Sequence, residues 1–442
     1  MAVSRFKSSR HPHGGKAYGE RRREPPGDSV PDLALVNAGE LVTCQGKGET
    51  AEEQLGIVRD GALVVEGGMV AWVGTTRELE RKTFGKPRRK VDAQGGLVTP
   101  GFVDPHSHLL FAGSREDELE LKAAGESYAS ILKSGGGIQR TVRETRKAPA
   151  EKIARESARR LGQLVANGVT TVEVKTGYGQ RASDELKMLD AIGLLRKTAG
   201  VELIPTFLGL HATPPEFKNS EEYASYAVRE MLPAVSEATV RPWFSDCFCE
   251  VGVFSNGDCS KYLRASRKLG LALKIHADEF SDSGGASLSA QLGCVSADHL
   301  GKSSMSGVRA MASKGVVAVL LPGTSLYSSI PYADARGIIR AGCTVALGTD
   351  LSPNSWIESP QLVMSLACVG MRMTPAQALL GFTLNAAKAV SRSDIGSLDV
   401  GSAADFAVHA LPGYRFLPYR VGGHYVRDVF KRGRKVYASM AV

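Results

Sequence analysis

The chain has no apolar run approaching the ~20 residues needed to cross a bilayer, and its basic beginning has no apolar stretch typical of a secretory signal. Cysteine is sparse: seven are scattered over 442 residues, and the odd number argues against a complete disulfide framework. Cys247 and Cys249 lie in an apolar run with no second Cys/His pair at zinc-finger spacing, which favours reduced core thiols. These features predict a cytoplasmic protein without a membrane segment.

A nucleic-acid partner is not indicated by the net charge of +9. Residues 1–28 hold seven Lys or Arg against three acidic residues, so +4 of the charge comes from this tail. The middle of the chain has no basic face with interleaved aromatic residues. We expect solvated charge and no nucleic-acid binding. Binding through the tail, the alternative, predicts affinity that collapses with salt and vanishes without residues 1–28.

The chain divides into a tail, a central α/β segment and two flanking β segments. Residues 1–31 are rich in Arg, Gly, Pro and Ser, which predicts a disordered tail. Short apolar runs bounded by turn residues occur from Leu33 and again near the C-terminus, so we expect a small β-sandwich built from both chain ends (32–98 and 394–442). Residues 99–393 alternate buried strands with amphipathic helices, which predicts a TIM-type (β/α)₈ barrel.

Eight barrel strands are predicted from apolar runs rich in Val, Ile, Leu and Ala. They are Leu97–Pro105, Val169–Lys175, Glu202–Leu208, Trp243–Glu250, Leu271–Ile275, Cys294–Ala297, Val316–Leu321 and Thr344–Gly348.

Polar residues with metal-binding chemistry gather where these strands end. Of nine histidines, five come just after a predicted strand: His106, His108, His211, His276 and His299. Asp350 follows the eighth strand. In an extended His-x-His segment both rings point to the same face, so both can reach one cation. Imidazole and carboxylate ligands suit Zn²⁺ or Fe²⁺, and a catalytic zinc lowers the pKa of its bound water to ~7. A lone histidine is more often structural, but this recurrence at strand ends favours a metal site.

Two segments resemble the amidohydrolase superfamily. One is Thr99-Pro-Gly-Phe-Val-Asp-Pro-His-Ser-His108, and the other is Gly396-Ser-Leu-Asp-Val-Gly-Ser-Ala-Ala-Asp405, with Ser402 where Lys is frequent. Four further segments resemble the imidazolonepropionase family within it. They are Phe111–Arg115 with Gly135–Ile138, Glu173–Gly179, Phe207–Pro215 and Lys274–Glu279.

The resemblance implies one divalent metal, Zn²⁺ or Fe²⁺, held by His106, His108, His276 and Asp350. Binuclear relatives carry a carboxylated lysine at the end of strand four, whereas this chain has Cys249-Glu250-Val-Gly there. The implied reaction is hydrolysis of 4-imidazolone-5-propanoate to N-formimidoyl-L-glutamate. Asp350 would accept a proton from water, His299 would stabilise the oxyanion, and Glu279 would pass a proton to the leaving ring nitrogen.

The resemblance also implies that Arg115 grips the propanoate carboxylate, with Tyr178, His211 and Glu279 contacting the substrate. Because Glu116, Asp117 and Glu118 follow Arg115, an ordinary surface ion pair is its alternative role. One departure lies in the loop after Asp350, where Ser352 replaces the family's common Asn. Its reach is shorter, so Asn354 and Ser355 are further candidates for substrate contact.

Three alternatives remain besides this function. Another mononuclear amidohydrolase, such as a cyclic amidine deaminase, would share the metal ligands but would not need Arg115. A catalytically dead barrel acting as an oligomeric scaffold would be expected to lose metal ligands, which this chain keeps. Nucleic-acid binding through the tail is the third. By analogy with similar barrels, we expect a homodimer.

Overall fold

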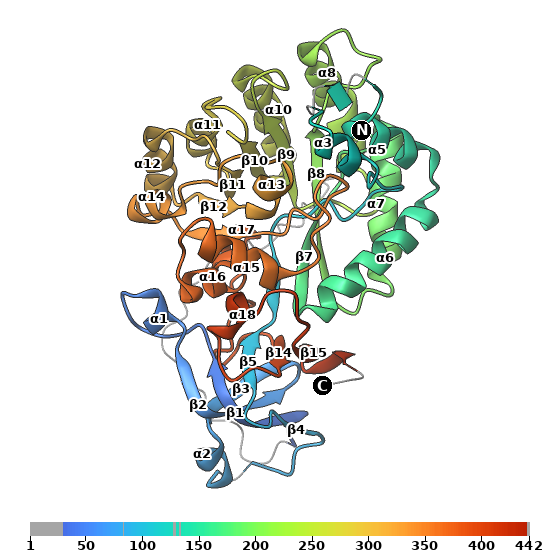
Figure 1. Ribbon diagram of the computed structural model, residues 1–442. Helices are drawn as coiled ribbons and strands as arrows, with labels where there is room; N and C mark the ends of the chain where they lie inside the picture. The colour runs from blue at the N-terminus through green and yellow to red at the C-terminus, as the bar shows by residue number, and fades with distance from the viewer. Residues whose placement is uncertain (1–29, 83, 127–129, 132–133, 440–442) are drawn as a thin grey trace, which may run out of the picture.

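A computed structural model describes residues 30–82, 84–126, 130–131 and 134–439 (Figure 1). The predicted tail at 1–31 therefore lies outside the described residues, except for Val30 and Pro31. Among the described residues, no helix has the length and apolar character required to cross a membrane.

An all-parallel sheet of eight strands occupies the centre of the chain. Its strands follow one another in chain order, as a (β/α)₈ barrel requires. The segments that continue its first and last strands are joined by two backbone hydrogen bonds, from Asp350 N to His106 O at 3.0 Å and from His108 N to Leu351 O at 2.9 Å. The strands are β6 (Phe102–Asp104), β7 (Val169–Lys175), β8 (Glu202–Leu210), β9 (Phe244–Cys249), β10 (Ala272–Ala277), β11 (Ser296–His299), β12 (Val317–Leu320) and β13 (Val345–Leu347).

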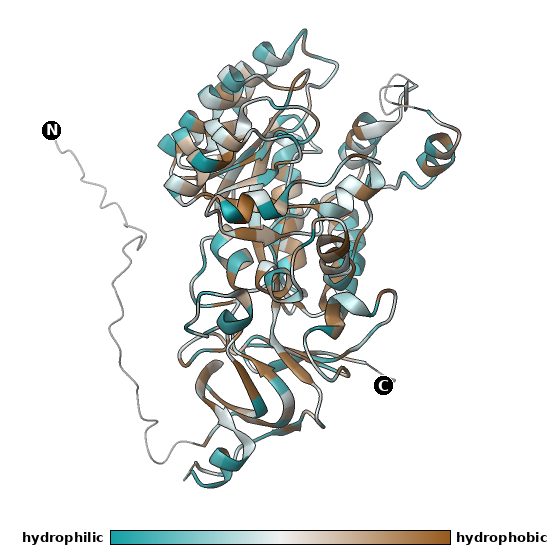
Figure 2. Cartoon of the chain, turned by 60° about the vertical axis from the view of Figure 1, so that its left-hand side comes forward, coloured by the Kyte–Doolittle hydropathy of each residue, from teal (hydrophilic) through white to brown (hydrophobic). Residues whose placement is uncertain are grey.

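Helices cover the outside of this sheet, and the brown strands of Figure 2 lie between helices of mixed hydropathy. This arrangement explains why the strands are nearly continuous apolar runs, since both faces of the sheet are buried. The helices of the described residues, of which α1 and α2 lie beside the second sheet in Figure 1, are α1 (Ala51–Gln54), α2 (Thr76–Glu80), α3 (Glu118–Ala123), α5 (Gly137–Lys147), α6 (Ala150–Ala166), α7 (Ala182–Arg196), α8 (Ser220–Tyr226), the π-helical η1 (Ala227–Met231), α9 (Leu232–Ser236), α10 (Asn256–Lys268), α11 (Gly285–Leu292), α12 (Met305–Lys314), α13 (Pro322–Tyr327), α14 (Ala335–Arg340), α15 (Pro360–Val369), α16 (Pro375–Gly381), α17 (Leu384–Ala389) and α18 (Phe416–Tyr419).

A second, mixed sheet is built from strands of both chain ends and lies below the barrel in Figure 1. The strand order is β16-β15-β14-β5-β1-β2-β3, with β4 beside β1. This sheet confirms the predicted β module made from both ends of the chain. Its strands are β1 (Leu33–Val42), β2 (Ile57–Glu66), β3 (Met69–Thr75), β4 (Lys90–Asp92), β5 (Leu97–Pro100), β14 (Phe406–His409), β15 (Val426–Lys431) and β16 (Arg434–Ala438).

The predicted first barrel strand, Leu97–Pro105, was wrong as a single element. Its first half, β5, pairs with β1 and β14 in the mixed sheet, and its second half, β6, pairs with β7 in the barrel. The chain changes sheet at Gly101, where a Cβ atom would lie 2.3 Å from Thr170 Oγ1. The close approach of the two sheets thus requires glycine here, which a run of apolar residues did not reveal.

Candidate active site

Three histidines and one aspartate meet at the C-terminal end of the barrel. His106 and His108 follow β6, His276 lies in β10, and Asp350 comes three residues after β13. Asp350 Oδ1 lies 3.4 Å from His106 Nε2 and 3.3 Å from His108 Nε2, and the latter lies 3.3 Å from His276 Nε2. The structure thus brings together all four residues predicted from the sequence as metal ligands.

The spacing of these atoms fits a single metal ion. Ligand atoms held tetrahedrally at ~2.0–2.1 Å from zinc lie about 3.3 Å from one another, close to the separations in this cluster. Among the described residues, the buried His106 Nε2 has no hydrogen-bond partner, which is costly for a polar atom unless a ligand satisfies it. Burial holds the pKa of His106 and of His108 well below its usual value, as does the neighbouring positive charge. Neutral rings have the lone pair that a cation needs.

A layer of carboxylates orients the histidine rings. Asp298 Oδ2 lies 2.6 Å from His106 Nδ1, and Asp246 Oδ2 lies 3.1 Å from His276 Nδ1. A carboxylate at Nδ1 fixes the tautomer in which Nε2 faces the metal. Lys175 lies between these two carboxylates, at 2.7 Å from Asp246 and 3.7 Å from Asp298.

The buried charges around the site also suit a divalent cation. Two ammonium groups and four carboxylates surround the histidines, so when all are ionised the set has two negative charges in excess; its members are Lys175, Lys274, Glu173, Asp246, Asp298 and Asp350. The opposing carboxylates raise the pKa of Lys175 despite its burial. Because unbalanced charge is expensive in a protein interior, a divalent ion suits this set of charges.

Glu279 and His299 lie beside the cluster, at 3.7 Å between Glu279 Oε2 and His299 Nε2. Burial raises the pKa of Glu279 well above its usual value, and the charges of Asp350 and Glu250 act in the same direction. Burial also lowers the pKa of His299 well below its usual value. The pair therefore combines a carboxyl group that holds its proton more tightly than usual with an imidazole that gains one less readily than usual. His299 and Asp350 adopt positive φ angles of 76° and 49°, a strained conformation that clusters at functional sites.

Two aromatic residues extend the site from the predicted metal ligands. The His211 ring stacks on that of His108 at 5.1 Å between centroids, and Tyr178 lies 5.1 Å from His211 and 6.0 Å from His108. His211 Nδ1 is 3.2 Å from the Gly177 carbonyl oxygen. Both predicted substrate contacts thus lie beside a predicted metal ligand.

Arg115 is buried, at 7% exposed, and donates to Glu118 at 2.7 Å. The ion pair considered from the sequence exists, but it is not at the surface. Arg115 Nη2 also lies 3.4 Å from Asn354 Oδ1, so the structure connects Arg115 to the loop after β13. Within the described residues, Arg115 Nε has no hydrogen-bond partner.

Ser352 and Ser355 are buried in that loop and hydrogen-bond largely within it. Ser355 N donates to Ser352 Oγ at 3.2 Å, and Ser355 Oγ donates to the Asp350 carbonyl oxygen at 3.0 Å. These bonds hold the loop against the segment that carries Asp350.

Comparison with known proteins matches residues 97–436 to the Amidohydrolase family. Imidazolonepropionase from Geobacillus sp. (strain WCH70) is 44% identical over 417 residues, covering 92% of this chain and 98% of the relative. The imidazolonepropionase of Symbiobacterium thermophilum is 43% identical, with 92% and 97% covered. The chain belongs to the imidazolonepropionase family.

Solved structures of more distant proteins share the fold. A zinc-bound adenosine deaminase from Xanthomonas campestris has a TM-score of 0.70 at 18% identity, covering 92% of this chain and 93% of that one. A triazine hydrolase variant has a TM-score of 0.73 at 17% identity, with 92% and 94% covered. At this level of sequence identity, the structural likeness supports the barrel fold but does not indicate which substrate is bound.

Within this imidazolonepropionase-family chain, sequence reasoning assigned no role to Asp246, Asp298 or Thr324. Asp246 is a charged residue inside the otherwise largely apolar β9, and Asp298 directly precedes His299. Both positions could have been recognised from the sequence as candidate site residues. Thr324 Oγ1 donates to Asp350 Oδ2 from α13, and nothing in its local sequence marks it. Lys175 forms ion pairs with Glu173, Asp246 and Asp298, which join the carboxylates behind the histidines.

Proposed function

We propose that this chain hydrolyses 4-imidazolone-5-propanoate to N-formimidoyl-L-glutamate. The observation that carries the proposal is the identity of 44% with an imidazolonepropionase over nearly the whole of both chains. The histidine–aspartate cluster supplies the hydrolytic chemistry that this reaction needs.

His106, His108, His276 and Asp350 would hold one divalent ion, with Zn²⁺ and Fe²⁺ both suited to these ligands. Such an ion, when bound, activates water at neutral pH and polarises a carbonyl group. The reaction adds water across the ring amide: the oxygen attacks the carbonyl carbon, the ring C–N bond breaks, and the nitrogen gains a proton.

The chain's own residues would handle the protons and the developing charge. Asp350 is placed to accept the proton of the attacking water, and the hydrogen bond from Thr324 orients its second oxygen. His299, neutral and next to the cluster, would donate to the oxygen of the carbonyl as it becomes negative. Glu279, whose pKa is raised by burial, would give its proton to the leaving nitrogen.

Arg115 would bind the propanoate carboxylate, because a guanidinium offers two parallel donors to such a group. Its burial next to Asn354 supports this role, since a buried cation binds a carboxylate more selectively than a solvated one. Further contacts to the substrate would come from Tyr178, His211, Ser352, Asn354 and Ser355.

The chain's organisation completes the proposal. We place domain boundaries at 32–98, 99–393 and 394–442, and we place the enzyme in the cytoplasm, where its seven free cysteines stay reduced.

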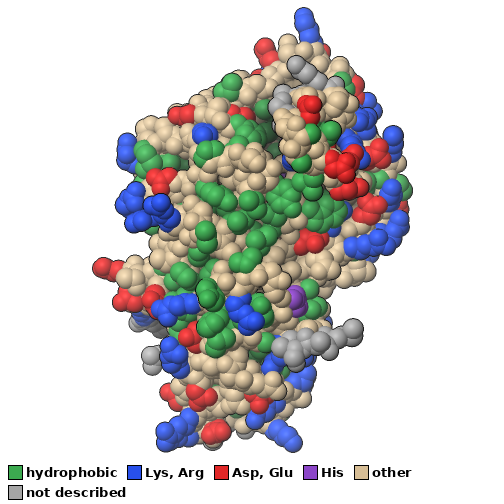
Figure 3. Space-filling view, in the orientation of Figure 1, with side chains coloured by type: hydrophobic (Ala, Val, Ile, Leu, Met, Phe, Trp, Pro, Cys, Tyr) green, Lys and Arg blue, Asp and Glu red, His purple; other side chains and the backbone are tan. Residues whose placement is uncertain are grey.

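Apolar side chains gather across the middle of the face in Figure 3. Val369, Phe416, Tyr419 and Val421 are exposed on or beside the neighbouring helices α15 and α18, which supports a homodimer. Sedimentation of the purified protein tests this assembly.

The function is tested by following the ultraviolet absorbance of imidazolone propanoate with wild type, Arg115→Ala and, as a matched control, Arg155→Ala. Wild type should consume the substrate. Arg115→Ala should mainly raise KM, while the exposed Arg155 should be dispensable. Wild type that holds about one metal per chain yet leaves this substrate untouched would contradict the proposal and favour the alternative, a deaminase of a cyclic amidine.

A further inference from the structure

Arg160 is a buried cation outside the cluster of histidines. It lies on α6, on the outside of the barrel, and is 4% exposed. Within the described part of the chain it has no carboxylate within ion-pair distance, and burial lowers its pKa to about 10. A buried charge without an ionic partner is expensive, so its other contacts must account for it.

The guanidinium of Arg160 holds the chain between two site residues. Its Nε donates to the Leu109 carbonyl oxygen at 3.1 Å, and its Nη2 donates to that of Phe111 at 2.7 Å. Ser157, one helical turn away, also donates to the Leu109 carbonyl at 3.2 Å. Leu109 directly follows His108, and Phe111 lies four residues before Arg115.

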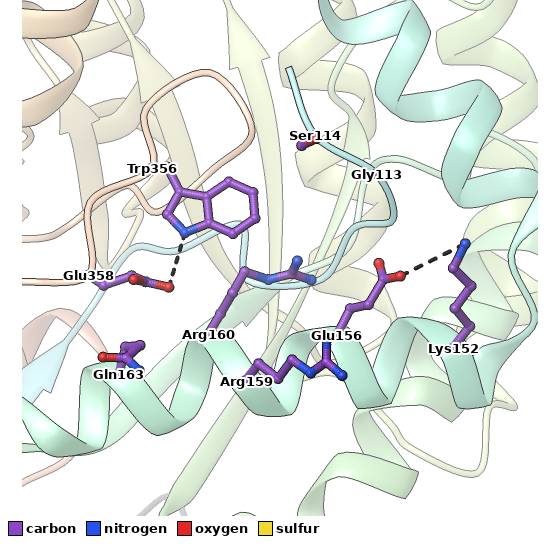
Figure 4. Close-up of a pocket in the computed structure, with 9 residues that line it drawn as sticks. All are labelled: Gly113, Ser114, Lys152, Glu156, Arg159, Arg160, Gln163, Trp356 and Glu358. Atoms are coloured by element: carbon purple, nitrogen blue, oxygen red, sulfur yellow. Dashed lines mark hydrogen bonds and ion pairs between the residues drawn. The ribbon is translucent and has the colours of Figure 1, made fainter. Parts of the chain in front are cut away.

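The same guanidinium also contacts the Phe111 ring and, in a second loop, the ring of Trp356. Arg160 Cζ lies 3.7 Å from the centroid of the Phe111 ring and 5.5 Å from that of Trp356. The two rings meet edge to face at 5.2 Å. Trp356 follows Ser355 in the loop after β13, and its Nε1 donates to Glu358 at 3.0 Å. Figure 4 shows Arg160 beside the indole of Trp356, at the edge of a cavity of 450 Å³.

We propose that Arg160 is a positioning residue for substrate binding, which fixes the loop 109–115 relative to the loop 352–356. The inference rests on the proposed function, in which Arg115 and the serines of these loops bind the substrate. A planar guanidinium can donate to both carbonyls while its Cζ atom lies over the Phe111 ring and near that of Trp356. Lysine, with one compact ammonium, can keep the charge but not this geometry.

The test compares Arg160→Met and Arg160→Lys with Arg159→Met. Arg159 is the matched control, because it is the next residue on α6, lines the same cavity and is exposed. In Arg160→Met we expect KM to rise about tenfold or more with a smaller change in kcat and an unchanged metal content, because displaced binding groups lose affinity. Arg160→Lys should recover part of the loss, and Arg159→Met should behave as wild type.

Hydrogen exchange separates this inference from the proposed function. In Arg160→Met, amides of both 109–115 and 352–356 should exchange faster, whatever the substrate, and Arg159→Met should leave them unchanged. The inference is overturned if Arg160→Met lowers only the melting temperature, with normal KM and exchange in these two loops. Wild type inactive on imidazolone propanoate would sink the proposed function alone.

Chemical rescue gives a further check. The cavity beside Arg160 is lined by Gly113, Ser114 and Trp356, so it offers a route for a small cation. Millimolar guanidinium should lower the raised KM of Arg160→Ala and leave the KM of wild type unchanged. The same proportional effect on wild type would contradict a specific site for the guanidinium at position 160.

Discussion

The mixed sheet and the C-terminal end of the barrel are both buried, but they are filled differently. The core of the mixed sheet is apolar, as in the stacking of Phe406 on Phe430 at 4.4 Å between ring centroids. The end of the barrel instead buries imidazoles, carboxylates and lysines in contact with one another. Apolar contacts contribute independently and non-directionally, whereas each buried ion depends on its partners. Substitutions should therefore change stability in the first region and chemistry in the second.

The largest effect is expected from removing one of the proposed metal ligands. His108→Ala should lose the bound metal and reduce activity below detection, because His108 Nε2 contacts both Asp350 and His276. Elemental analysis and the imidazolone propanoate assay measure both effects. The exposed His424 provides the control, since His424→Ala should keep the metal and the rate. Full activity in His108→Ala would refute this site.

Loss of a proton donor should have the next largest effect. Glu279→Gln keeps the shape of the side chain but cannot release a proton, so kcat should fall by roughly 10²–10⁴ with the metal retained. Steady-state kinetics and elemental analysis check this result, with Glu237→Gln, an exposed residue directly after α9, as the control. A normal kcat would assign proton transfer to another group.

A smaller effect is expected from changing a residue that contacts a proposed metal ligand without being one itself. Asp298→Asn should weaken metal binding by about 10–100-fold, because the carboxylate that orients His106 loses its charge. Competition with a chelator measures the affinity, and the exposed Asp190→Asn is the control. If both variants bind the metal as tightly as wild type, Asp298 does not orient the ligand.

The same contrast explains what the sequence could predict. His106, His108, His276 and Asp350 were identified because each comes at or near the end of an apolar strand, and parallel strands bring such ends together. The buried charges behind these residues were not identified. The contacts of Asp246 and Lys175 depend on the register between β7, β9 and β10, which the sequence alone does not reveal. Arg160 was missed for a related reason: its carbonyl partners lie 49 and 51 residues away in the chain.

Substitution in the mixed sheet should leave kcat and metal binding unchanged. It therefore tests most directly whether the two buried regions differ in what they determine. Phe430→Ala removes a fully buried ring from the apolar core, so the free energy of unfolding should fall by about 3–5 kcal/mol. The kcat and metal content of the folded enzyme should match wild type, because Phe430 packs in the apolar core of the mixed sheet. Urea unfolding followed beside the rate of the folded protein tests this, with the exposed Val400→Ala as the control. A fall in kcat as large as that of Glu279→Gln would mean that the two buried regions are coupled, since the packing of the mixed sheet would then set the geometry of the barrel's end.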